Sequence, residues 1–248
     1  MLAPDETLMN RPHILMVAAN PAISTTTGWP VGFWAAELVH PYHAFREADL
    51  DVTIASPDGG RIDPDALSVP NDPSGYSRDD RLSADYLGRP AFVALLQQTP
   101  AIAKLRPDDF DAIVVCGGQA PMFTFADAAA LQRRFAEFLA AGKPSAALCH
   151  GSCLLLYLRD AQGQPTIRGR TITGFTNAEE DVADAAVGQR VMPFRIEDEA
   201  RRLGADFRAA PAFTSHALRD GNLITGQQQH SGAAVAALVL EALAEGRR

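Results

Sequence analysis

The chain has 248 residues, of which 47% are hydrophobic and 21% charged, as in an ordinary globular protein with a substantial core. Its net charge of −8 argues against a general nucleic-acid binder, which needs a basic face. Three cysteines (Cys116, Cys149 and Cys153) are too few for a disulfide framework, and with no second Cys/His pair beside them they predict no metal centre.

The N-terminal segment has acidic residues before its apolar stretch and no basic region, so it is not typical of a signal peptide. No apolar run approaches the roughly 20 residues that cross a bilayer. The sparse cysteines fit a reducing compartment. We therefore expect a cytoplasmic protein with reduced thiols and no membrane partner.

The first half of the chain alternates short apolar runs with helical patterns. It predicts buried strands over residues 14–19, 52–55 and 111–116 and a helix over 37–48, in which Pro41 must produce a kink or end the first turn. Residues 57–90 are rich in Pro, Gly, Asp and Ser. A connection this long in a compact domain is usually functional or mobile, so we interpret it as a flap with short helical pieces.

The second half continues the alternation. We expect a helix over residues 126–141 that stops at Gly142, a strand over 146–149, a short β-prone segment over 171–174, a helix over 197–203, a strand over 223–225 and a closing helix over 231–244. Short apolar strands between amphipathic helices indicate a parallel sheet covered on both faces. With no internal repeat or linker, the sequence predicts one α/β domain over residues 1–248.

Residues 145–155 are the most informative stretch. Cys149 closes an apolar run, His150 and Gly151 follow, and a second apolar run starts at Leu154. This pattern predicts a strand, a sharp turn and a helix: a nucleophile elbow with sulfur in place of the serine oxygen. A thiol at a helix N-terminus meets unpaired N–H groups, which favour the thiolate. The alternative is a buried cysteine that happens to precede a histidine.

Two further features are candidates for the same site, because ligands gather at the carboxyl ends of the strands in such sheets. Gly117-Gly118 directly follows a predicted strand, and the amides of Gly118 and His150 are candidates for an oxyanion hole, although turns are the commoner use of such a pair. Glu37 lies near the start of the first helix. It is either a carboxylate that interacts with the helix dipole or a protonated acid hydrogen-bonded to the sulfur.

Several motifs occur in an order typical of a known family. They are Gly32-Phe33-Trp34-Ala35-Ala36-Glu37 with Pro41, Gly117-Gly118, Ala147-Leu148-Cys149-His150-Gly151 and Thr173-Gly174-Phe175-Thr176-Asn177-Ala178-Glu179-Glu180, continued by Val191-Met192-Pro193-Phe194 with Glu197-Asp198 and by residues 221–227. Together they resemble the ThiJ/PfpI superfamily, and more narrowly its glyoxalase III-like branch, which also contains holding chaperones. The resemblance covers nearly the whole chain. It implies a flavodoxin-like, class I glutamine amidotransferase-like fold: a single doubly wound, mostly parallel sheet with helices on both faces.

The resemblance also implies roles for individual residues. Cys149 would be the nucleophile, His150 the adjacent acid/base and Glu37 the carboxylate beside the sulfur. A later acidic residue orients the histidine in this branch, and Glu180 is its match, with Glu179 as the alternative; both also fit a solvated helix start.

The residues that border the substrate show departures from the branch. Gln119, Gly117 and Gly151 are the pocket candidates, but the branch usually has a histidine where Gln119 stands. Glutamine cannot take up a proton near neutral pH, so a proton relay at this position would be lost. His230 also follows a motif of the branch, and we interpret it as a surface cap rather than a pocket residue.

The function that this resemblance implies is cofactor-free, glyoxalase III-type conversion of small 2-oxoaldehydes such as methylglyoxal to 2-hydroxy acids, in a homodimer without metal or glutathione. A cysteine-dependent C–N hydrolase (a peptidase, an amidase or an isonitrile hydratase-like enzyme) is the first alternative. A redox sensor or holding chaperone is the second. A true glutamine amidotransferase is disfavoured, because the histidine adjoins the cysteine and the late Pro-x-His-x-Glu motif is missing.

Overall fold

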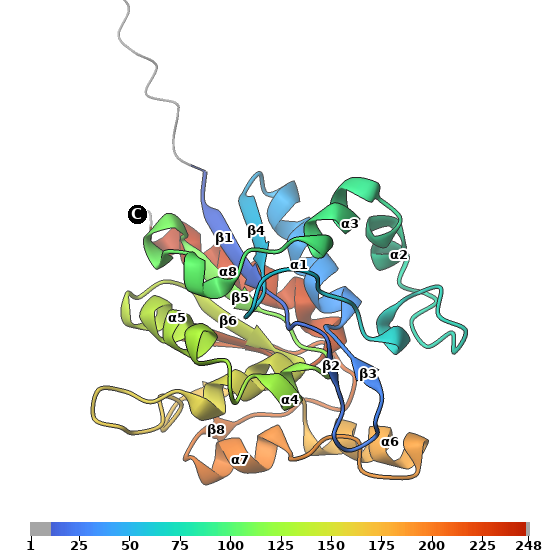
Figure 1. The fold of residues 1–248 in the computed structure, drawn as a ribbon. Helices are drawn as coiled ribbons and strands as arrows, with labels where there is room; N and C mark the ends of the chain where they lie inside the picture. The colour runs from blue at the N-terminus through green and yellow to red at the C-terminus, as the bar shows by residue number, and fades with distance from the viewer. Residues whose placement is uncertain (1–10, 247–248) are drawn as a thin grey trace, which may run out of the picture.

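The centre of the molecule is a six-stranded sheet, seen in the computed structural model, which describes residues 11–246 (Figure 1). Its strands, in the order in which they lie side by side, are β4 (Asp51–Ala55), β1 (His13–Val17), β5 (Ala112–Val115), β6 (Ser145–Leu148), β10 (Leu223–Gly226) and β9 (Ala217–Asp220). Every neighbouring pair is parallel except β10 and β9. The predicted doubly wound, flavodoxin-like order is therefore confirmed, with one antiparallel strand added at the edge.

The added strand β9 is not predicted from the sequence pattern. Its four residues are all half-buried, and they include Arg219 and Asp220, so they lack the apolar run that marks the inner strands. Gly221-Asn222 joins β9 to β10 as a tight turn, with Gly221 at a φ of +62°. The turn, rather than hydrophobicity, produces this strand.

Helices cover both faces of the sheet, as predicted (Figure 1). On one face α1 (Ala35–Glu47) packs against α8 (Gly232–Glu245), beside α2 (Arg81–Leu87) and α3 (Pro90–Gln97). The other face is covered by α5 (Ala129–Ala140), α4 (Pro121–Thr124) and the 3-10 helix Cys149–Tyr157. Each face has its own cluster of buried apolar side chains. Pro41 does not end the helix, because α1 continues past it to Glu47.

A smaller layer lies beside the carboxyl edge of the sheet. It consists of the strand pair β7 (Thr171–Ile172) and β8 (Asp206–Phe207) with the helices α6 (Asn177–Val187) and α7 (Ile196–Arg202). In the sequence, Glu179 and Glu180 fit a helix start, but no helix range is predicted for α6. A capping box fixes its start: the Thr176 side chain accepts from the Glu179 N–H, and the Glu179 carboxylate accepts from the Thr176 N–H.

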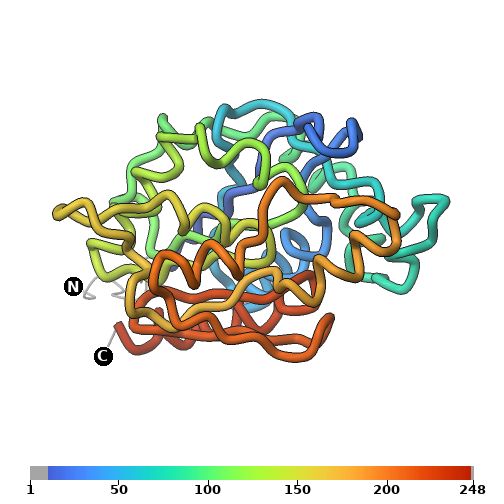
Figure 2. Tube along the Cα trace, turned by 90° about the horizontal axis from the view of Figure 1, so that it is seen from below, coloured from blue at the N-terminus to red at the C-terminus, as the bar shows by residue number. Residues whose placement is uncertain are grey.

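Residues 57–90 contain the 3-10 turn Ala66–Ser68 and α2 among irregular turns. The antiparallel pair β2 (Ala22–Ile23) and β3 (Pro30–Val31) follows β1 in the chain as a separate small sheet, and β2 packs against α4. Short 3-10 turns occur at Ile102–Lys104, Pro107–Asp109 and Gln229–Ser231. In Figure 2, the segment around residues 70–80 (teal) and the segment that carries α6 (yellow-orange) lie at the same end of the molecule. Within residues 11–246, no helix is long and apolar enough to cross a membrane.

Candidate active site

Cys149 lies at the turn between β6 and the 3-10 helix that follows it. Its φ is +54°, a left-handed conformation that is rare for residues other than glycine. The hydroxyl of Ser152 donates to the carbonyl oxygen of Cys149 at 2.6 Å and holds the turn closed. Gly151 is equally constrained, since a Cβ there would lie 2.5 Å from the carbonyl oxygen of Cys116. The Cys-His-Gly-Ser sequence thus forms the strand–turn–helix geometry expected of an elbow, although the helix is of the 3-10 type.

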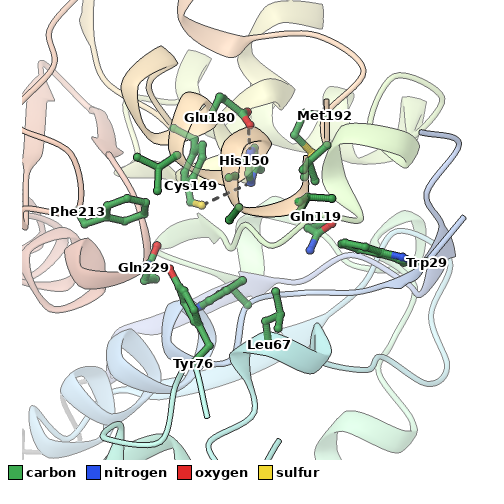
Figure 3. Close-up of a pocket in the computed structure, with 17 residues that line it drawn as sticks. Trp29, Leu67, Tyr76, Gln119, Cys149, His150, Glu180, Met192, Phe213 and Gln229 are labelled. Atoms are coloured by element: carbon green, nitrogen blue, oxygen red, sulfur yellow. Dashed lines mark hydrogen bonds and ion pairs between the residues drawn. The ribbon is translucent and has the colours of Figure 1, made fainter. Parts of the chain in front are cut away.

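His150 lies between the sulfur and a carboxylate (Figure 3). Its Nδ1 is 3.8 Å from the Sγ of Cys149, and its Nε2 is 3.0 Å from Oε1 of Glu180. The imidazole is buried, and it packs on the ring of Phe175 with 4.2 Å between the ring centroids. A histidine held in this way has one nitrogen committed to the carboxylate and the other directed at the thiol.

The two adjacent glutamates of α6 have different partners. Glu180, in the first turn of the helix, is the one at hydrogen-bonding distance from His150. Glu179 instead accepts from the N–H of Thr176, from the N–H of Phe213 and from Nε2 of Gln227, the last two at 2.9 Å. Glu179 is therefore a structural anchor of the surrounding loops.

Glu37 is completely buried under the turn that contains Gly117. Its Oε2 accepts from the N–H of Gly117 at 2.8 Å. A Cβ at Gly117 would lie 2.5 Å from that oxygen and 2.8 Å from the Cβ of Cys149, so only glycine fits between the two. Burial raises the pKa of Glu37 to about 8, which keeps the acid protonated below that pH.

The electrostatics of the sulfur differ from the expectation drawn from the sequence. Burial and the charge of Glu37 raise the pKa of the Cys149 thiol well above its ordinary value, while the N–H of His150 acts in the opposite direction. The N–H of His150 favours the thiolate, as expected at this turn, but burial and Glu37 outweigh it in the resting site. A 3-10 turn brings one amide to the sulfur, and its effect is smaller than that of removing the sulfur from water.

The Gly117–Gly118–Gln119 turn is held by Asp65, a residue that no sequence motif singles out. Asp65, which is 2% exposed, accepts from the N–H of Gln119 at 2.7 Å and from the N–H of Gly32 at 2.8 Å. Burial raises the pKa of Asp65 to about 7. Nothing local marks this residue, because it is one aspartate among several in a Pro/Asp-rich segment.

Gly118 follows with a φ of +105°, and a Cβ there would lie 2.5 Å from the backbone of Phe33 and Trp34. Within the described part of the chain no group accepts from the Gly118 N–H. This unpaired amide lies next to the turn of Cys149, but Gly118 is buried and is not among the residues that line the pocket described below.

The sulfur and the imidazole open into a pocket of about 190 Å³. Its walls come from segments far apart in the sequence, including Trp29, Trp34, Leu67, Tyr76, Phe175, Val187, Met192 and Phe213. Gln119 also lines the pocket, and its Oε1 has no hydrogen-bond partner among the described residues. Gly117 and Gly151, which we expected to border substrate, are not among its lining residues. They are packed against Glu37 and Cys116 instead.

His230 is exposed at the short turn before α8 and does not line this pocket. It borders a neighbouring depression that also contains His40 and Asp80. Within residues 11–246 no three or more His, Cys, Asp or Glu side chains gather as they would around a metal ion.

Comparison with known proteins places this site in a family. The sequence model of the DJ-1/PfpI family matches residues 31–242. The glutathione-independent glyoxalase HSP31 of Saccharomyces cerevisiae is 28% identical over 221 residues, which cover 87% of this chain and 91% of that protein. Glyoxalase 3 of Candida albicans is 26% identical with the same coverage of both chains.

Solved structures show the same similarity. The crystal structure of glyoxalase III from Candida albicans superposes with a TM-score of 0.77 at 25% identity, covering 93% of this chain and 97% of that one. The Rapid Encystment Protein of 24 kDa from Francisella tularensis superposes with a TM-score of 0.83 at 26% identity, covering 94% and 99%. The similarity extends over nearly the whole fold.

Proposed function

This chain belongs to the DJ-1/PfpI family, and on that premise we propose that it is a cofactor-independent, glyoxalase III-type enzyme that converts 2-oxoaldehydes to 2-hydroxy acids through Cys149. The observation that carries the proposal is the series of contacts from Glu180 through His150 to the sulfur, next to a pocket. The names of the relatives, a glutathione-independent glyoxalase and a glyoxalase, support the same chemistry.

The first step is formation of the nucleophile. Because the thiol has a raised pKa, it needs a base, and Nδ1 of His150 is the nitrogen that faces it. Glu180 accepts a hydrogen bond from Nε2–H, which fixes the tautomer and leaves Nδ1 free to take the thiol proton. The sulfur then adds to the aldehyde carbon, C1, and forms a hemithioacetal. The oxygen that develops charge lies against the amides of Gly118 and His150.

The second step is an internal redox reaction. His150 first gives the thiol proton to the hemithioacetal oxygen and is neutral again. It then takes the hydrogen on C1 as a proton and returns it to C2 through an enediol, while the proton of the C1 hydroxyl passes to the oxygen on C2. C1 is oxidised to a thioester while C2 is reduced to an alcohol, so no external oxidant is needed. One water molecule then hydrolyses the thioester, which releases the 2-hydroxy acid and restores the thiol.

Gln119 occupies the position at which the resembled branch usually has a histidine. Its side chain lines the pocket, and a glutamine amide can form hydrogen bonds with a substrate but does not carry a proton. We therefore assign it to positioning the substrate.

The test is glutathione-free conversion of methylglyoxal to lactate by the wild type and by Cys149→Ser. We expect turnover in the wild type and its loss in the variant. Cys153→Ser is the matched control, because this second buried cysteine lies four residues away, contacts the carbonyl of Pro121 and does not line the pocket. Full turnover in Cys149→Ser would contradict the proposal.

A cysteine-dependent C–N hydrolase is the second candidate. Gln119 favours it, because hydrolysis of a C–N bond does not require a proton to move between two substrate carbons. Turnover of amides without turnover of methylglyoxal would favour this function. A redox sensor is the remaining alternative, in which Cys149 would be oxidised rather than turned over.

A further inference from the structure

The residues that line the pocket are of two chemical kinds. The polar lining groups are the side chains of Gln119, Cys149, His150, Glu180 and Gln229 and the hydroxyl of Tyr76. The remaining lining residues are apolar. Among the described residues, no lysine or arginine lines the pocket, and Glu180 is its acidic residue. A phosphate or carboxylate on the substrate would therefore meet no cation, and beyond the reacting carbons the pocket offers apolar contact.

One helix supplies much of the apolar wall. Val182, Ala183, Ala186 and Val187 of α6 line the pocket, at a spacing that places them on one side of the helix. Val191 and Met192 continue this wall beyond the helix. Figure 3 shows Trp29, Leu67 and Tyr76 on the side opposite His150 and Glu180.

The apolar surface also continues to the mouth of the pocket. Large hydrophobic side chains are exposed at five places in residues 11–246, and three of them line this pocket: Trp29 at 40%, Tyr76 at 57% and Val182 at 51% exposure. Their gathering at one opening marks a surface for an apolar ligand.

We propose that the preferred substrates are 2-oxoaldehydes whose substituent is apolar and larger than methyl, such as a branched alkyl or aryl group. This inference rests on the proposed function, because it places the two carbonyl carbons at Cys149. One methylene group in a hydrophobic pocket changes kcat/KM by roughly 10–200-fold. The α6 wall and the rim leave room for several such groups.

The test compares methylglyoxal with propylglyoxal and isobutylglyoxal, which have the same reacting carbons and differ only in the alkyl group. We expect kcat/KM to rise at least about tenfold from methyl to isobutyl. A flat or falling series would overturn the inference while leaving the proposed function in place.

Two adjacent alanines of α6 offer a matched pair of variants. Ala185 and Ala186 are both exposed, but Ala186 lines the pocket and Ala185 does not. Ala186→Asp should lower the isobutyl-to-methyl ratio of kcat/KM several-fold, because it places a charge in the apolar wall. Ala185→Asp adds the same charge to the same helix and should leave the ratio unchanged. Equal ratios in the two variants would contradict the assignment of this wall.

A binding measurement separates this inference from the proposed function. The chain has two tryptophans, Trp29 and Trp34, and both line the pocket, so intrinsic fluorescence reports its occupancy. In Cys149→Ala, 4-methyl-2-pentanone should change the fluorescence at a concentration at least about tenfold lower than acetone does. If all glyoxals are inert but this difference holds, the proposed function fails and the pocket selectivity stands. If the two ketones bind equally, the selectivity fails.

Discussion

The carboxylate of Glu180 reaches from α6 to the ring of His150, with 3.0 Å between Oε1 and Nε2. The opposite ring nitrogen faces the sulfur of Cys149 at 3.8 Å. The two contacts fix the imidazole from both ends, and the packing of Phe175 on the ring fixes its plane. The orientation of His150 therefore depends on a residue that lies 30 positions away in the chain.

The first prediction concerns this carboxylate. Glu180→Gln keeps the size of the side chain but removes the charge that stabilises a protonated imidazole, so we expect kcat to fall by roughly 10²-fold or more. Asp181→Asn is the control, because Asp181 is the next residue of α6, is exposed and pairs with Arg195. Steady-state kinetics on methylglyoxal would show the difference, and equal kcat in the two variants would contradict the role of Glu180.

The second prediction concerns the glycine between Glu37 and Cys149. In Gly117→Ala the new Cβ would meet an oxygen of Glu37 at 2.5 Å and the Cβ of Cys149 at 2.8 Å. We expect a loss of roughly 1–3 kcal/mol in the free energy of unfolding and a loss of turnover, since the sulfur must move. Gly246→Ala meets nothing closer than 3.7 Å and should be neutral. Urea unfolding of both variants measures this.

The third prediction concerns Asp65, whose two carboxylate oxygens accept from the N–H groups of Gly32 and Gln119. Asp65→Asn replaces one carboxylate oxygen with an NH₂ group, which would face the backbone N–H of Gly32 or of Gln119. This contact between two donors should lower the free energy of unfolding by roughly 1–3 kcal/mol. Turnover should fall with it, because the Gln119 turn also carries the free amide of Gly118. Asp63→Asn, which loses only a surface pair with Arg61, is the control. An unaltered unfolding curve for Asp65→Asn would show that this cross-link is dispensable.

The fourth prediction concerns pH. The native pKa of Glu37 is about 8, above its ordinary value of 4.5, so the native state holds a proton that the unfolded chain releases in this window. The contribution of Glu37 to the free energy of unfolding is complete below pH 4.5. It is lost as the pH rises to about 8, at up to roughly 1.4 kcal/mol per pH unit. Glu37→Gln should flatten this dependence in urea unfolding between about pH 5 and about pH 8. Identical slopes for wild type and variant would mean that Glu37 ionises normally.

Local patterns in the sequence were enough to predict the inner strands, the parallel sheet and the turn at Cys149, because each depends on residues that are neighbours in the chain. The partners that come from distant segments were not predictable in this way. Asp65 and Tyr76 lie in an irregular stretch of the sequence. Only the folded chain brings Tyr76 to the pocket and Asp65 to the turn beside it. The raised pKa of the thiol has the same origin, since it depends on complete burial beside Glu37.

The resemblance to a family identified a candidate residue that the hydrophobic periodicity of the sequence does not indicate. It singled out Glu180 from a run of acidic residues, and the capping box explains why its neighbour Glu179 is directed elsewhere. It did not indicate the apolar wall of α6, because Val182, Ala183, Ala186 and Val187 look in sequence like the buried side of any amphipathic helix.

The layout of α6 has a consequence for how this protein can change over evolutionary time. Glu180, which orients His150, lies in the first turn of α6, where Thr176 and Glu179 secure the helix start. The side chains that form the apolar wall lie in the following turns. Substitutions in the later turns can therefore alter which molecules fit without disturbing the first turn. Under the proposed function, point mutations at Ala183, Ala186 or Val187 would change the preferred substrate while the residues that orient His150 stay in place.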